Sequence, residues 1–291
     1  LLEEGHREEW FESSFIRWLT LIAVIGFSSL IYGQMNAPKP VLKLRLLLDR
    51  QFGSVAVMAL ALGMVMYGST YVIPQFLAII SDYNAFQTGL VIFWMGIPAF
   101  LLMPVLPFMI RRIHIRIAVG VGMLLMARSC FVSISLTAQS GGAVFTEGQL
   151  IRGVGMILSM MFLNQATVAS VAKADAGDAS GIFNAARNLG GSFALAGLAS
   201  FQDQRIWHHS RRMEESLNAN SVSVQNHLDG LARNFGGMDG AMAMLSRTIQ
   251  REAFVMTYND VFLAMGILTL ATVPLVVFLK PLPKNTSLSM H

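Results

Sequence analysis

The strongest constraint in this sequence is a series of seven apolar stretches, each long enough to cross a lipid bilayer as a helix. They cover residues 15–35, 53–80, 88–110, 116–138, 149–171, 181–201 and 260–279. A bilayer core of about 30 Å requires about 20 apolar residues in helical conformation. Hydrocarbon cannot hydrogen-bond to exposed backbone groups, so such stretches must form helices. The pattern therefore predicts an all-α polytopic membrane protein built as a helical bundle.

The amino-acid composition agrees with this class. Hydrophobic residues make up 54% of the chain and charged residues only 13%, whereas a soluble domain carries about 25% charged residues. The single cysteine, Cys130, lies inside an apolar stretch. One cysteine excludes an intrachain disulfide and a cysteine-based metal or redox site.

Basic residues are distributed unevenly among the connecting segments. Ten lysines and arginines lie in segments that alternate along one side of the expected bundle: 36–52, 111–116, 172–180 and 280–291. The short segments 81–87 and 139–148 contain none. Basic loops stay on the cytoplasmic side of a membrane. We therefore expect the linker 36–52 and the tail 280–291 in the cytoplasm, and segment 1–14 outside it.

The long segment 202–259 then lies on the extracytoplasmic side. Within it, we expect helices over residues 211–217 and 238–254, and in the second segment apolar side chains recur at roughly helical spacing. Two interpretations remain open: a solvated helical hairpin that caps the bundle, and a docking surface for an extracytoplasmic partner.

Polar residues within the apolar stretches are the candidates for a substrate cavity. Asn184, Arg187 and Asn188 are spaced by three and four residues, so they share one helix face. Three further candidates lie in other stretches: Gln75, Asn164 and Gln165. These side chains either line a central cavity or hold helices together, a contribution of about 0.6 kcal/mol each on average.

Four arginines lie within or at the edge of the stretches. Arg17 and Arg152 are near outer ends, Arg128 is about midway along its stretch, and Arg187 is one or two turns inside. An arginine at the centre of a membrane helix costs roughly 2.5–3.5 kcal/mol, so it usually faces the bundle interior or a cavity. A structural role and a substrate contact both remain open for each, and Arg187 is the first candidate for an interior role.

The sequence carries no pattern typical of an enzyme. It lacks the His-Glu-x-x-His, Gly-x-Ser-x-Gly and P-loop motifs, so we expect no catalytic residue, no metal ligand and no cofactor.

Carboxylates such as Asp82, Glu147, Asp203 and Asp260 lie at the ends of stretches or in loops. A proton-coupled transporter needs a buried ionisable group, and no stretch shows an acidic one. A non-transporting membrane scaffold and an uptake carrier for another small molecule remain as alternatives.

Several segments resemble one known family. Residues 179–192, ASGIFNAARNLGGS, are similar to the penultimate-helix signature of the 14-span drug:proton antiporters, the EmrB/QacA type of the major facilitator superfamily. Segments 9–13, 40–52 and 71–77 resemble the outer loop before that family's eighth span, the lead-in to its ninth span and the ninth span itself. One departure is the loop 108–116, which lacks the glycine and aspartate usual there.

The resemblance implies the C-terminal half of such an antiporter. Residues 15–35 would be an extra transmembrane helix, and residues 53–279 would be the C-terminal six-helix bundle, with 202–259 as its long extracytoplasmic loop. The whole protein would export amphipathic toxic compounds in exchange for protons by alternating access. The family's proton-coupling carboxylates belong to the N-terminal half, so the resemblance implies no proton site here.

The resemblance also implies the partners and the location. The partners would be the lipid bilayer, the missing N-terminal half, small-molecule substrates and a periplasmic adaptor protein that contacts loop 202–259, with no nucleic acid. The proton gradient would supply the energy. The protein would be a multi-pass protein of the cell inner membrane with a cytoplasmic C-terminus.

Overall fold

The described part of the chain is helical throughout. The computed structural model describes residues 14–36, 43–172, 175–216, 222–234 and 237–279, and no β-strand occurs in these ranges. The expected tail 280–291 and all but the last residue of segment 1–14 lie outside the described residues. The α-helices are α1 (Ser14–Asn36), α2 (Arg50–Ile79), α3 (Ala85–Leu102), α4 (Leu106–Arg112), α5 (Ile115–Phe131), α6 (Ala143–Ala169), α7 (Ala176–Ser216), α8 (Val222–Asn234) and α9 (Met238–Thr272). Two short 3₁₀ helices are η2 (Leu44–Leu48) and η4 (Val273–Phe278).

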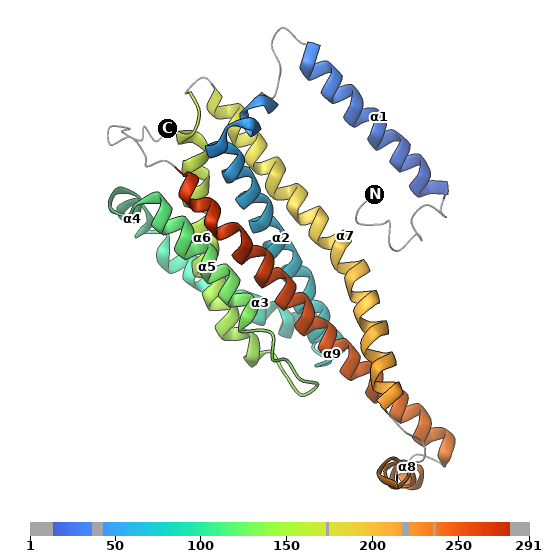
Figure 1. Ribbon diagram of the computed structural model, residues 1–291. Helices are drawn as coiled ribbons and strands as arrows, with labels where there is room; N and C mark the ends of the chain where they lie inside the picture. The colour runs from blue at the N-terminus through green and yellow to red at the C-terminus, as the bar shows by residue number, and fades with distance from the viewer. Residues whose placement is uncertain (1–13, 37–42, 173–174, 217–221, 235–236, 280–291) are drawn as a thin grey trace.

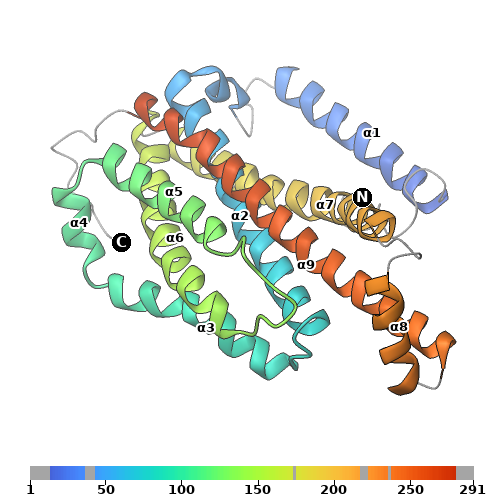
Figure 2. The same ribbon diagram turned by 60° about the horizontal axis from the view of Figure 1, so that its bottom comes forward.

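Six long elements form one bundle (Figures 1 and 2). The most extensive helix pairs are α2 with α7 and α5 with α6, while α3 covers α6 and α9 contacts α2, α5 and α7. Helix α1 lies beside the bundle, on the side of α7, in both views. Its large apolar side chains, including Trp18 and Ile22, are exposed.

The lengths and compositions of the helices fit a bilayer. Within the described residues, α2, α3 and the continuous helical stretch Met238–Phe278 are each long and apolar enough to span a membrane. The exposed side of α3 carries Phe93, Phe100 and Leu101, which would face lipid rather than water. The prediction of an all-α polytopic membrane protein is confirmed.

Local hydrogen bonds explain where two spanning helices begin. The Asp49 side chain accepts hydrogen bonds from the backbone N–H groups of Gln51 at 2.8 Å and Phe52 at 3.1 Å, which caps α2. At the start of α3, the Asn84 side chain accepts from the Gln87 backbone at 2.9 Å, and the Gln87 side chain accepts from the Asn84 backbone at 3.0 Å. This capping box satisfies two backbone donors that the helix cannot pair itself.

The structure corrects several expected boundaries. The stretch 88–110 is not one helix, because α3 ends at Leu102 and α4 begins at Leu106, with Pro104 in the intervening turn. The stretch 116–138 contains a helix that stops at Phe131. Arg128 therefore lies in the last turn of α5, exposed and 3.7 Å from the Glu147 carboxylate, and not midway along a span.

The segment 202–259 is largely helical. Helix α7 continues past residue 201 to Ser216, α8 follows, and α9 starts at Met238. The helical prediction is confirmed for residues 211–216 and 238–254, while Leu217 lies outside the described residues. In Figure 1 the last part of α7, all of α8 and the first part of α9 project beyond the end of the bundle, whereas Gln202 and Tyr258 are buried within it. We call the projecting part, residues 207–216, 222–234 and 238–250, the helical arm.

Aromatic rings fill the core near one end of the bundle. The Phe76 ring of α2 packs edge-on against Phe145 of α6 and Tyr258 of α9, with centroid separations of 5.4 and 5.3 Å. Phe262 adds a tilted contact with Phe145 at 6.3 Å. All four side chains are almost completely buried, so this cluster fixes how α2, α6 and α9 pack against one another.

Candidate functional site

A polar face of α7 carries three of the residues expected to line a substrate cavity. Asn184 and Asn188 are exposed at the surface of the bundle, and Arg187 between them is half-buried. The Asn184 side-chain N–H donates to the Ser180 carbonyl at 3.0 Å, and the Tyr67 hydroxyl of α2 donates to Asn188 Oδ1 at 3.3 Å. The three side chains therefore form one polar strip on the outer side of the α2–α7 pair.

Arg187 is held without a counter-charge. One guanidinium nitrogen, Nη1, lies 3.8 Å from the Met160 sulfur of α6, and the buried Nε has no hydrogen-bond partner. No carboxylate of the described residues lies within ion-pair distance of Arg187. A guanidinium that is half-buried and unneutralised can attract an acceptor group on a ligand.

Helix α6 places Asn164 on the same side as this strip. Asn164 lies four residues after Met160, so both point from one face of α6. Helices α6 and α7 run in opposite directions, and Met160 contacts Arg187. One turn further along α6, Asn164 therefore lies beside the turn of α7 that carries Asn184. Asn164 is exposed, and its neighbour Gln165 is half-buried with an Oε1 atom that has no hydrogen-bond partner.

Gln75 lies apart from the other candidates. Its Oε1 accepts a hydrogen bond of 3.0 Å from the side chain of Gln202, which is buried on α7. Gln202 follows Asn188 by 14 residues, so the two are about 21 Å apart along the helix axis. The expected single set of cavity residues is therefore divided between the strip and a separate glutamine pair.

Glycines allow the close approach of α2 and α7 beneath the strip. A Cβ atom added at Gly63 would lie 1.9 Å from the Arg187 carbonyl oxygen, and one added at Gly190 would lie 2.1 Å from the Leu60 carbonyl oxygen. Both distances are far below van der Waals contact, so neither position has room for a side chain. Small residues at helix crossings are typical of membrane proteins. Gly190 belongs to the segment 179–192, which resembles the penultimate-helix signature of the drug:proton antiporters.

Arg152 is more deeply buried than its place in the sequence indicated. It is 2% exposed. Its Nη1 donates to Gln149 Oε1 at 2.9 Å and its Nε donates to Ser129 Oγ at 3.3 Å, while Nη2 has no partner. Arg152 therefore joins α6 to α5 inside the bundle, and it does not extend to the membrane surface.

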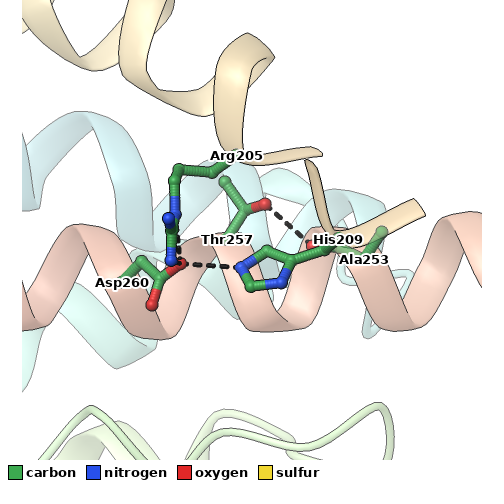
Figure 3. Close-up of polar contacts among 5 residues, drawn as sticks. All are labelled: Arg205, His209, Ala253, Thr257 and Asp260. Atoms are coloured by element: carbon green, nitrogen blue, oxygen red, sulfur yellow. Dashed lines mark hydrogen bonds and ion pairs between the residues drawn. The ribbon is translucent and has the colours of Figure 1, made fainter. Parts of the chain in front are cut away.

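Sequence reasoning missed a cluster of charged residues between α7 and α9 (Figure 3). Arg205 and His209 of α7 both contact the Asp260 carboxylate of α9, at 2.6 and 2.7 Å. The sequence placed Asp260 at the end of a stretch. Arg205 and His209 are four residues apart and so share one face of α7, but no sequence pattern links that face to a residue 51 positions away.

The other end of the bundle carries an ion pair between η2 and α7. Lys43 donates to the Asp175 carboxylate just before α7. The hydrogen bond and charge of Asp175 raise the pKa of Lys43 above its usual value of 10.5. Lys43 is therefore charged at neutral pH, and the pair ties the segment before α2 to the start of α7.

No group of three or more His, Cys, Asp or Glu residues within the described ranges is placed to hold a metal ion.

Similar proteins place this bundle in a family of transporters rather than enzymes. The chain is 26% identical over 283 residues to the colistin resistance protein EmrB of Acinetobacter baumannii, and the aligned region covers 96% of this chain and 55% of that protein. It is 24% identical over 287 residues to the multidrug export protein EmrB of Escherichia coli K12, with 97% and 55% covered. For the fatty acid resistance protein FarB of Neisseria gonorrhoeae, the identity is 25% over 283 residues, with 97% and 55% covered.

The chain thus spans about half the length of the curated relatives it matches. The recognised resemblance to EmrB-type proteins is confirmed over nearly the whole chain. The family model that describes the Major Facilitator Superfamily matches residues 4–195, about two thirds of the sequence. The all-helical bundle with membrane-spanning helices agrees with that match, and the chain belongs to the Major Facilitator Superfamily.

Proposed function

We propose that this chain acts in a multidrug exporter that moves amphipathic toxic compounds out of the cell by alternating access, in exchange for protons. The observation that carries the proposal is the polar strip of Asn184, Arg187 and Asn188. It lies on the outside of the bundle rather than in its core, next to Met160 and Tyr67. Polar groups at membrane depth are costly unless they face protein or a water-filled cavity.

A second helical bundle would cover the strip and complete the cavity. Such an arrangement places a substrate site near the bilayer midplane between two bundles that rock against each other. Methionine suits loose recognition because its flexible side chain repacks around different ligands. The names of the relatives, which refer to multidrug export, colistin resistance and fatty acid resistance, support a broad range of amphipathic substrates.

The distribution of basic residues supports an orientation in the membrane. Lys43 and Arg116 lie at the end of the bundle where α2 begins, and this end would face the cytoplasm. The helical arm at the other end would then be extracytoplasmic. We propose a cell inner membrane location, a cytoplasmic C-terminus and an adaptor protein that docks on the arm, where Trp207, Met242 and Met244 are exposed.

Efflux from living cells tests the proposal. The full-length gene is expressed in a strain that lacks its major efflux pumps, and the loss of a fluorescent amphipathic dye is measured with and without an uncoupler. The proposal predicts faster efflux than in the empty-vector strain, and loss of that difference when the proton gradient collapses. Efflux that is equal in both strains would refute export, and efflux unaffected by the uncoupler would refute proton coupling.

A further inference from the structure

The charged cluster between α7 and α9 has a geometry suited to binding a proton. Asp260 Oδ2 accepts a hydrogen bond of 2.6 Å from Arg205 Nε, and Arg205 Nη2 forms an ion pair with the same oxygen at 2.6 Å. The same oxygen lies 2.7 Å from His209 Nε2. The side chains of His209 and Asp260 are 14% and 23% exposed, so both are largely buried but still in contact with solvent. Figure 3 shows that the two α7 side chains converge on this one carboxylate.

The contacts determine which nitrogen of His209 can exchange a proton. The Asp260 carboxylate is paired with a guanidinium, and an ionised carboxylate only accepts hydrogen bonds. The hydrogen on the short contact must therefore belong to His209 Nε2. That assignment leaves Nδ1 as the atom that gains or loses a proton, and histidine is the side chain whose charge ordinarily changes between pH 5 and 8.

Other ionisable groups on α7, α9 and α2 have contacts of their own. On α7, His208 packs edge-on against His209 with ring centroids 5.6 Å apart, and it forms no ion pair with Asp260. On α9, the Arg251 guanidinium donates to the carbonyls of Ile80 and Ala138. On α2, Tyr71 interacts electrostatically with Tyr258 of α9. Asp260 pairs with His209 across α7 and α9.

The cluster lies where the helical arm meets the bundle. Asn259, next to Asp260, hydrogen-bonds to both backbone groups of Leu136 in the connection after α5, at 2.9 and 3.0 Å. Because His209 lies near this end and its side chain is 14% exposed, we expect a proton to reach it from water at the end of the bundle. The same helix, α7, carries the polar strip, so a charge change at His209 alters how the strip-bearing helix is fastened to α9.

We propose that Arg205, His209 and Asp260 form a proton-binding site of the transporter, in which His209 Nδ1 takes up the proton and Asp260 stabilises the resulting imidazolium. Arg205 holds the Asp260 carboxylate against α7. The inference rests on the proposed proton-coupled export, for which it supplies an ionisable site in this part of the molecule.

The first test reads the histidine directly. The full-length transporter is labelled with ¹⁵N-histidine and purified in detergent, and its imidazole resonances are followed from pH 8 to pH 5. His209→Gln assigns the resonance, because glutamine keeps a donor toward Asp260 but does not titrate in this range. We expect Nδ1 of His209 to change from bare to protonated while Nε2 stays protonated. An Nδ1 signal that does not change, or an Nε2 that carries no hydrogen, would overturn the inference.

The second test measures the proton in function. His209→Gln and the control His208→Gln are compared in proteoliposomes with an imposed pH gradient and in potentiometric titration. We expect His209→Gln to take up about one proton fewer than the wild type between pH 8 and 5 and to lose the pH dependence of transport, with His208→Gln keeping that pH dependence. If the wild type transports with proton coupling and His209→Gln has an unchanged pH profile, the inference fails. If the wild type does not transport, the proposed function fails, and the NMR result still decides on the proton site.

Discussion

The crossing of α2 and α7 offers a sharp prediction, because Gly190→Ala adds one carbon where there is no space. The new Cβ would lie 2.1 Å from the Leu60 carbonyl oxygen, and real contacts of this kind are not shorter than 3.0 Å. The helices must therefore separate by about 0.9 Å, the difference between these two distances, in an interior with few voids. Overpacking of a tight interior costs about 1–3 kcal/mol, and a clash with rigid backbone belongs at the upper end.

The helix propensity of alanine offsets part of this cost. Alanine is favoured over glycine by about 1 kcal/mol in a helix, so Gly190→Ala should destabilise the protein by about 2 kcal/mol. Gly197→Ala on the same helix is the matched control, since nothing lies within 4 Å of its added Cβ. Only the propensity gain applies there, and the free energy of unfolding should stay the same or rise.

Thermal unfolding of the detergent-purified full-length protein, followed by size-exclusion chromatography, checks the pair. A loss of about 2 kcal/mol corresponds to a decrease of about 3 °C in midpoint for a unit of this size. Gly63→Ala, which acts at the same crossing, should produce a similar decrease, and the double variant should lose less than the sum because the helices have already separated. Equal midpoints for Gly190→Ala and Gly197→Ala would refute the claim that a close helix crossing is built on glycine.

Three further predictions concern charged and polar contacts. Arg187→Ala should impair dye efflux far more than Arg17→Ala, and equal efflux at matched expression would argue against an interior role for Arg187. Gln75→Leu should lower stability by about 1–2 kcal/mol, because it leaves the buried amide of Gln202 unpaired, whereas replacing both by leucine should restore most of the loss in a thermal unfolding assay. Lys43→Gln should lower the unfolding midpoint at pH 7. Because the folded state raises the pKa of Lys43, its ion pair contributes below pH 10.5 and is lost as the pH rises through the raised value, so the difference should vanish in strongly alkaline buffer.

The sequence predicted the helices well where hydropathy and helix ends coincide. The stretches 15–35 and 53–80 correspond to α1 and α2 within a few residues. Hydropathy reports depth in the membrane and not the end of a helix, so the stretch 181–201 gave no sign that α7 runs on to Ser216. Hydropathy also did not indicate the break at Pro104, since the residues on both sides of the turn are apolar.

Side-chain partners across helices were the hardest feature to predict. Helical spacing placed Asn184, Arg187 and Asn188 on one face, and the structure has them there. No such rule relates α7 to α9, because the relative rotation and register of two helices are set by packing. The pairing of Arg205 and His209 with Asp260 and the burial of Arg152 against Ser129 both depend on that packing, so they emerged from the structure alone.

Water access to the polar strip tests the central claim most directly. Cys130 is buried and can be replaced by alanine, after which Asn188→Cys and Ile267→Cys are introduced separately into the full-length transporter. Ile267 is the control, because it is exposed on the apolar side of α9. A membrane-impermeant thiol reagent should label the cysteine at 188 and not the one at 267, and an exported compound should slow the labelling at 188. Equal reactivity at the two positions, or labelling at 188 that no exported compound slows, would contradict a substrate passage along this face of α7.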